Sequence, residues 1–178
     1  HNLYIDKTDV HPTLTAQSDL DVNWVMNFIE DSAAFDLNGN TLHVGNDFYF
    51  RQGCAFTHGG GTVVFDGNEA DQLIRNYSLQ WLVFNHVTME GQGIKRIYNG
   101  PVDFDGNVTI TNTTLETGEK LRVAGDWDNN GTFNHTNQLI FDGANQAVSG
   151  SDFHDAFFQG TGSKTLGGNI NLSGGLII

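Results

Sequence analysis

Several residue types that mark common protein classes are scarce in this 178-residue chain. A single cysteine, Cys54, excludes an intramolecular disulfide and a cysteine-based zinc site. Apolar runs are short, such as residues 81–84 and 176–178, and none approaches the ~18–20 residues of a membrane-spanning helix. Lysine and arginine number only eight against 21 acidic residues, which gives a formal net charge of −13. Because nucleic acids and anionic membranes require a cationic surface, we expect neither partner and no membrane insertion.

Proline occurs only twice, while glycine, asparagine and threonine together make up about a third of the chain. This composition predicts many turns and short strands and argues against long helices. Aromatic residues form 11% of the sequence, which supplies enough apolar area to exclude disorder. Few lysines, abundant Asp, Asn, Thr and Gly, and the missing disulfide favour an extracellular microbial protein. We therefore expect an extracellular or cell-surface location.

A degenerate internal repeat runs through the chain. Phe65-Asp66-Gly67-Asn68 recurs 39 residues later from Phe104 and, in part, 37 residues after that from Phe141. A longer match pairs residues 41–67 with residues 120–143, and its offset drifts from 79 to 76. Between short alternating segments lie Asn-Gly, Asp-Gly and Gly-Gly pairs, which supply the positive φ angles of tight turns. A stack of similar coils generates such a drifting repeat naturally.

The pattern predicts an all-β fold, a right-handed parallel β-helix (β-solenoid) with a short N-terminal cap. With roughly 18–25 residues per coil, the chain makes about eight coils and a rod of about 40 Å. An antiparallel β-sandwich is the alternative. We expect an N-terminal arm and cap in residues 1–32 and the solenoid repeat domain in residues 33–178. Within the cap, residues 21–29 fit either a short amphipathic helix or a strand built on Val22, Trp24 and Met26.

Two segments resemble known surface proteins. Residues 35–48 (FDLNGNTLHVGNDF) and residues 125–153 (GDWDNNGTFNHTNQLIFDGANQAVSGSDF) are similar to repeat segments of bacterial, Bacteroidetes-like surface adhesins and haemagglutinin-type β-helix proteins. The likeness covers roughly residues 33–178 and is one of style and composition, without a catalytic signature. It implies a β-helical, non-enzymatic protein with an adhesive or structural role at the cell surface.

The two ends of a solenoid carry open strands that invite pairing with another chain. Near the N-terminus, Leu3 and Ile5 alternate with polar residues, and the C-terminus finishes on the apolar residues Leu176, Ile177 and Ile178. Strand addition between these segments would join copies head to tail, which generates a filament instead of a closed ring. The expected partner is therefore a second copy of the chain or a cell-surface glycan.

One segment carries the first half of a calcium-binding loop. Asp126, Asp128 and Asn130 followed by Gly131 satisfy the pattern D-x-[DN]-x-[DN]-G, whose oxygens can wrap a hard cation. The terminal glutamate of such a loop is replaced by Asn137. The segment is therefore either a calcium turn or a polar β-turn, and we expect no other cofactor.

No nucleophile-elbow, Walker or Rossmann pattern occurs, and we expect the protein not to be an enzyme. The alternative is a carbohydrate-binding or polysaccharide-degrading β-helix domain, which would use surface aromatic residues and acidic turns. Three carboxylate pairs could serve it: Asp103 with Asp105, Asp126 with Asp128, and Asp152 with Asp155.

Overall fold

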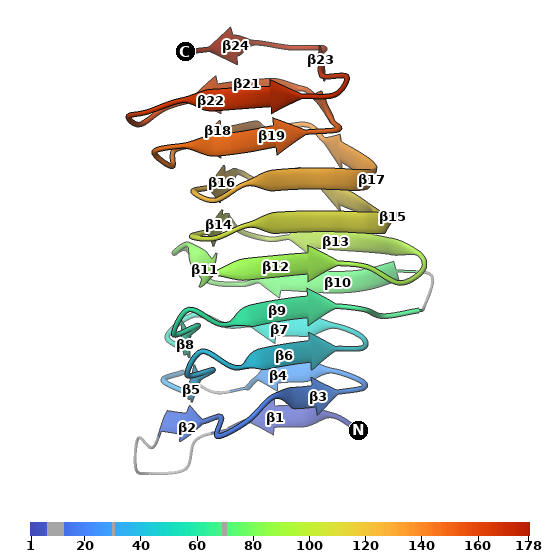
Figure 1. Cartoon of the computed structure of the whole chain (residues 1–178). Helices are drawn as coiled ribbons and strands as arrows, with labels where there is room; N and C mark the ends of the chain where they lie inside the picture. Colours follow the sequence, from blue (N-terminus) through green and yellow to red (C-terminus); the bar gives the residue numbers. More distant parts are fainter. Residues whose placement is uncertain (7–12, 30, 69–70) are drawn as a thin grey trace.

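The computed structural model describes residues 1–6, 13–29, 31–68 and 71–178, which contain 24 strands and no helix. Every strand pairing among these residues is parallel. The strands stack as a three-sided coil of about eight turns, in which each turn adds a strand to each side (Figure 1). This confirms the predicted β-solenoid and excludes the antiparallel sandwich.

We call the three sides the front, back and side faces, following Figure 1. The front face contains β3 (Leu20–Val22), β6 (Thr41–Val44), β9 (Thr62–Phe65), β12 (His86–Met89), the first halves of β15 (Val108–Thr117) and β17 (Trp127–His135), β19 (Gln146–Ser149) and β22 (Lys164–Gly167). The back face contains β1 (Leu3–Ile5), β4 (Met26–Phe28), β7 (Phe48–Phe50), β10 (Asp71–Asn76), β13 (Ile94–Tyr98), the second halves of β15 and β17, β20 (Asp152–Phe153) and β23 (Asn171–Leu172). The side face contains β2 (Thr13–Thr15), β5 (Ala34–Asp36), β8 (Ala55–Thr57), β11 (Leu82–Phe84), β14 (Val102–Phe104), β16 (Leu121–Val123), β18 (Gln138–Phe141), β21 (Asp155–Phe158) and β24 (Leu176–Ile177).

The coil winds in the right-handed sense. In Figure 1 the front strands run to the right and the back strands run to the left while the chain rises from the N-terminus to the C-terminus. Parallel strands joined in this way follow the handedness that twisted strands favour.

Alternation along each strand sends apolar side chains into the coil, where successive turns stack them on one another. Phe28, Phe48, Phe65, Phe84 and Phe104 are almost fully buried in the N-terminal half, and their rings meet in edge-on and stacked contacts. A second aromatic group, built around Trp127, Phe133, Phe141 and Phe153, fills the C-terminal half. The core is therefore one continuous apolar column that contains two aromatic groups, with Val123 between Phe104 and Phe141.

The turns of the coil become shorter along the chain. Register partners lie 21–26 residues apart up to β13, as for Leu3 with Met26 and Phe48 with Ile74, and 17–21 residues apart beyond it. The shortening occurs where the front and back strands fuse into the single strands β15 and β17. In β15 the corner is reduced to a bulge at Asn112, which adopts a left-handed φ of 53°. Asparagine tolerates that conformation better than most residues.

Neither interpretation of residues 21–29 holds as a single element. The segment forms no helix, and Val22 and Met26 point inward from two separate strands, β3 and β4, with the half-exposed Trp24 at the corner between them. Strands β1 to β4 pair within the same stack as the later coils.

The repeated motif does not keep to one face of the coil. Phe65 ends β9 on the front face, whereas Phe104 and Phe141 end β14 and β18 on the side face. Phe104 and Phe141 are both in register with Val123, so they lie two turns apart on that face. Each Phe-Asp-Gly therefore marks the end of a strand and the corner that follows it, and the motif serves corners on two faces.

Candidate functional site

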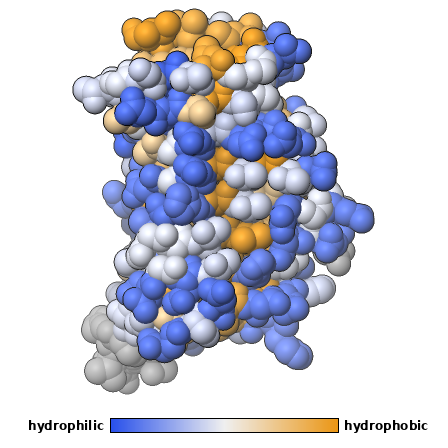
Figure 2. Space-filling view, viewed as in Figure 1, coloured by the Kyte–Doolittle hydropathy of each residue, from blue (hydrophilic) through white to orange (hydrophobic). Residues whose placement is uncertain are grey.

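The C-terminal coil exposes its apolar interior. Strands β22, β23 and β24 each pair with a preceding strand and have no partner on their other edge among the described residues. Leu166, Leu172 and Leu176 are in register with the buried Val148, Phe153 and Ala156, yet 55%, 39% and 48% of their surfaces are exposed. Figure 2 shows the resulting hydrophobic cap at this end. The neighbouring Ile177 and Ile178 are exposed as well.

The N-terminal coil presents the complementary edge. Leu3 and Ile5 of β1 are in register with Met26 and Phe28, and Ile5 is buried while Leu3 is partly buried. Leu14 of β2 is in register with Phe35 and has 49% of its surface exposed. Both ends of the molecule therefore combine unpaired strand edges with uncovered apolar side chains.

The five predicted assembly residues lie at opposite ends, but on different faces. Leu3 and Ile5 belong to the back face, whereas Leu176 and Ile177 belong to the side face. If one molecule stacks on another with its faces aligned, β24 meets β2, and β1 meets β23. Direct pairing of β24 with β1 would require one molecule to be rotated about the long axis by one face relative to the other.

The three predicted calcium ligands follow one another at the start of a strand and do not form a loop that wraps a cation. Asp126 lies at the corner before β17, and Asp128 and Asn130 belong to β17, where the Asn130 side-chain amide donates to Asp128 Oδ1 at 3.1 Å. Their oxygens also have protein partners: Asp126 Oδ1 accepts the N–H of Ala147 at 2.7 Å, and Asp128 Oδ1 accepts the Ser149 hydroxyl at 3.1 Å. No group of three or more His, Cys, Asp or Glu that could hold a metal ion occurs in the described ranges.

The side face carries a group of carboxylates around Arg122. The Arg122 guanidinium lies 3.8 Å from Asp103 and 4.0 Å from Asp142, and it packs over the Trp81 ring at 4.4 Å from the ring centre. Burial, followed by the charges of Asp105 and Asp142, raises the pKa of Asp103 to about 6. This is the environment of a carboxylic acid that can hold a proton near neutral pH.

The other carboxylates of the predicted pairs are held by local partners. Asp105 lies 3.3 Å from the His58 imidazole, and Asp155 accepts the N–H of Gly175 at 2.5 Å. Asp152 accepts the side-chain amide of Asn171 at 2.6 Å. The contacts of Asp152 and Asp155 join neighbouring coils and the Asp105–His58 contact spans two turns, which is a structural role.

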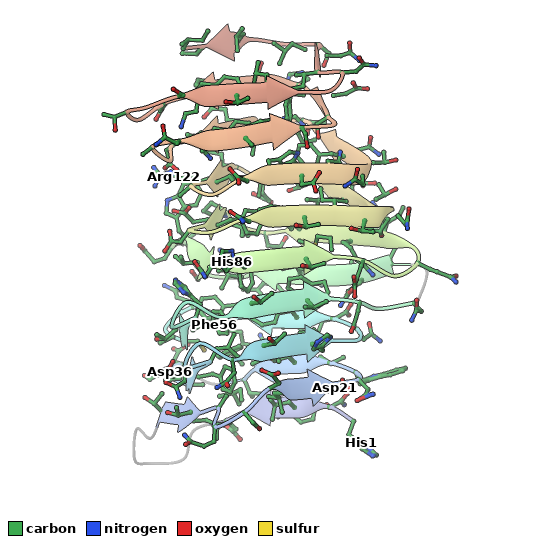
Figure 3. The ribbon with its side chains drawn as sticks, viewed as in Figure 1. His1, Asp21, Asp36, Phe56, His86 and Arg122 are labelled. Carbon is green, nitrogen blue, oxygen red and sulfur yellow. The ribbon has the colours of Figure 1, made fainter. Side chains whose placement is uncertain are left out.

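A groove opens on the side face where its sheet is interrupted. Strands β8 and β11 contact each other without forming ladder hydrogen bonds, and a cavity of about 370 Å³ lies beside them. Phe56, Leu79 and Trp81 line it, and 83% of the Leu79 surface is exposed. Figure 3 places Phe56 and Arg122 along the same side of the coil, with Phe56 nearer the N-terminal end.

The back face holds a feature that the sequence analysis missed. Three neighbouring strands of this face each have a tyrosine and an arginine two residues apart that point outward. We call these six residues the tyrosine–arginine platform: Tyr49 and Arg51 at β7, Arg75 and Tyr77 at β10, and Arg96 and Tyr98 at β13. Tyr49 and Tyr98 are both in register with Arg75. The shared pattern, an aromatic and a cationic residue separated by one buried residue, was visible in the sequence. Only the register shows that the three copies are neighbours.

Arginine and tyrosine side chains interlock across the platform. The Arg75 guanidinium lies over the Tyr49 ring and the Arg51 guanidinium over the Tyr77 ring, each at 5.6 Å from the ring centre. Within the strands, Arg75 donates to the Tyr77 hydroxyl at 2.9 Å and Arg96 to the Tyr98 hydroxyl at 3.5 Å. Cation–π contacts of this kind hold both partners in place while leaving the guanidinium edge available.

Comparison with known proteins adds no further assignment: no protein-family model, curated protein or solved structure matches this chain. The described residues also contain no helix that is long and apolar enough to cross a membrane.

Proposed function

We propose that the protein is a non-enzymatic structural subunit of the cell surface or extracellular space, which assembles end to end by strand addition. The observation that carries the proposal is that, among the described residues, the strands of both end coils have one unpaired edge, with inward-facing leucines exposed at the C-terminal coil and Leu14 at the N-terminal coil. Composition and the resemblance to surface adhesin repeats support the extracellular location.

Stacking with the faces aligned would cover two of the three exposed strand edges. The strands β23 and β24 would continue onto β1 and β2 of the next copy with the same parallel pairing, whereas the front face, which ends at β22 and starts again at β3, would lack one strand at the junction. Leu172 and Leu176 would then be covered by side chains such as Leu3 and Leu14. Each fully covered leucine contributes about 1.5–3 kcal/mol relative to an exposed one, so the contact gains both hydrogen bonds and apolar burial.

This contact is heterologous, because the two surfaces that meet are different. A heterologous contact along the axis of a rod does not close on itself and produces a linear polymer. The protein would therefore act mechanically, as a filament whose side faces remain free.

Assembly is tested by measuring the mass in solution across a range of concentrations, together with negative-stain images. We expect concentration-dependent fibres for the wild type. The double variant Leu172→Lys/Leu176→Lys places charges on the C-terminal surface and should remain monomeric, as should a chain lacking residues 173–178.

Leu79→Lys is the matched control. It removes a leucine from the flank of the coil that is even more exposed than Leu172 and Leu176, and it should leave the fibres unchanged. A wild-type protein that stays monomeric at all concentrations, or equal loss of fibres in L79K, would contradict the proposal.

A further inference from the structure

We propose that the tyrosine–arginine platform on the back face is a binding site for an acidic polysaccharide, a linear chain of uronic acids. The site lies on the flank of the coil and is independent of end-to-end stacking. It would give the protein an adhesive activity in addition to its structural one.

The first observation is that two guanidinium groups of the platform lack carboxylate partners. Arg96 pairs with Asp71 and Glu116 on this face, and Arg122 pairs with Asp103 and Asp142 on the side face. Neither Arg51 nor Arg75 forms an ion pair within the part of the chain that the structure describes.

The nearby acid on this face is already engaged. Asp47 receives the Tyr49 hydroxyl on one oxygen and the N–H of Leu73, at 2.8 Å, on the other. In a chain with a formal charge of −13, two arginines on neighbouring strands that form no ion pair among the described residues favour an anionic ligand, and Asp47 is the acid whose charge acts on Arg75.

The second observation is the geometry of the two arginines. They extend from neighbouring strands, which are about 4.8 Å apart, and each is fixed over a tyrosine ring of the other strand. The Nε atom of Arg75 is buried and its Nη1 donates to the Tyr77 hydroxyl, so only the outer N–H groups of the guanidinium can reach a ligand. A guanidinium held in this way is preorganised to donate charge-assisted hydrogen bonds to a carboxylate through these outer groups.

The third observation is the shape of the site. The platform covers three strands, or about 10 Å along the axis, on an open sheet face. Small ligands are usually enclosed in a cleft, whereas an extended chain can contact an open face through successive units. The tyrosine side chains add apolar surface and hydroxyl groups against which sugar rings can pack.

Charge separates this ligand from other polyanions. Nucleic acids and anionic membranes carry dense charge and are repelled by the many carboxylates elsewhere on the protein. At physiological ionic strength, charges more than about 8 Å away are largely screened, so a polymer with one carboxylate per sugar meets mainly the two arginines.

The experiment is affinity electrophoresis in native gels cast with or without polygalacturonate, a linear polyuronate. The stacking variant L172K/L176K serves as the background, so that failure of assembly and failure of glycan binding are read separately. We expect polygalacturonate to retard this protein and an uncharged glucan to leave it unaffected, and added salt should reduce the retardation.

Variants then assign the binding to the platform. Arg51→Gln/Arg75→Gln should weaken binding about tenfold or more, because charge-assisted hydrogen bonds are lost. Arg51→Lys/Arg75→Lys keeps the charge without the guanidinium group and should bind with intermediate strength. Arg122→Gln, the control on the side face, should bind like the background protein. Thermal unfolding shows whether each variant is folded. If the glutamine variant is unfolded, binding by the lysine variant decides whether the two arginines form the site.

Any one of four results would overturn the inference. One is the absence of retardation by polygalacturonate, and another is equal retardation by the neutral glucan. The third is an equal loss of binding in R122Q. Competition by polyglutamate as effective as that by oligogalacturonate would also reject it, since the ligand would then be an acidic peptide.

Discussion

Gln72 and Gln146 make the same pair of hydrogen bonds at two different corners of the coil. The Gln72 amide donates to the carbonyls of Val44, at 2.6 Å, and Asn46. The Gln146 amide donates to Val123 at 2.9 Å and to Gly125 at 2.6 Å. Both glutamines are buried and follow a Phe-Asp-Gly corner. The glutamine that follows the Phe-Asp-Gly corner therefore holds the backbone of the corner in the preceding turn through two hydrogen bonds.

Replacing either glutamine by leucine should destabilise the fold. In each case two carbonyls would lose the amide donor, while Val44 and Val123 would keep the backbone N–H of Asp66 and Asp142 at 3.3 and 3.1 Å. We therefore expect the free energy of unfolding to fall by about 1–3 kcal/mol. Denaturant unfolding of Gln72→Leu and Gln146→Leu measures the effect. Gln159→Leu, at an exposed position, is the control and should unfold like the wild type. Equal stability of all three variants would show that water replaces the amides.

Glycine at the third position of the corner is required by close packing. A Cβ atom at Gly143 would overlap the carbonyl oxygen of Ala124 in the turn below. Gly143→Ala should therefore force the two turns apart and lower the free energy of unfolding by about 1–3 kcal/mol. At Gly118 the nearest atom to such a Cβ, Thr136 Oγ1, is 3.6 Å away, and Gly118→Ala should be tolerated. Melting temperatures of the two variants provide the comparison.

Stability should depend on pH through Asp103. Its pKa is raised to about 6 in the folded protein, mainly by burial, against about 3.9 in an unfolded chain. The folded state therefore binds this proton more tightly, and the free energy of unfolding falls as the pH rises from about 4 to about 6.

Asp103→Asn should remove this part of the pH profile. We compare the free energy of unfolding of D103N with that of wild type at two pH values. Between pH ~4 and neutral pH this difference should shift in favour of D103N by on the order of 1–2 kcal/mol. Asp21→Asn, at an exposed front-face position that Figure 3 labels, removes the same formal charge and should keep the wild-type slope. Parallel profiles for wild type and D103N would refute the assignment.

Calcium binding by Asp126, Asp128 and Asn130 remains open to a direct test. Because the three residues do not form a loop that wraps a cation and Asp126 and Asp128 accept protein hydrogen bonds, we expect the same melting temperature in calcium and in chelator. A rise in melting temperature with calcium that Asp126→Asn abolishes would instead establish the site. Asp128→Asn provides a second test of the same ligand set.

Much of the fold could be predicted from the sequence, because alternation and turn residues are local signals. Val102, Phe104, Val108 and Ile110 all point inward, as their period of two indicates. The face on which a strand lies cannot be predicted from such local signals. It depends on the summed lengths of all preceding corners, and those lengths vary from turn to turn.

The same limit explains what was missed at the candidate sites. His58 and His135 look equivalent in the sequence repeat, yet His58 follows β8 on the side face and His135 is buried at the end of β17 on the back face. Conversely, Arg51 and Tyr77 are 26 residues apart and interact directly. The platform became visible only when the register was known.

The direction of the backbone hydrogen bonds has a mechanical consequence. The bonds between turns lie along the long axis, so tension between the two ends loads the turns in series. Under force, turns should peel from an end one after another, and each turn of about 20 residues would release roughly 60–65 Å of chain. Single-molecule extension should then show a regular series of small steps, by which the molecule dissipates a pull gradually without breaking all at once.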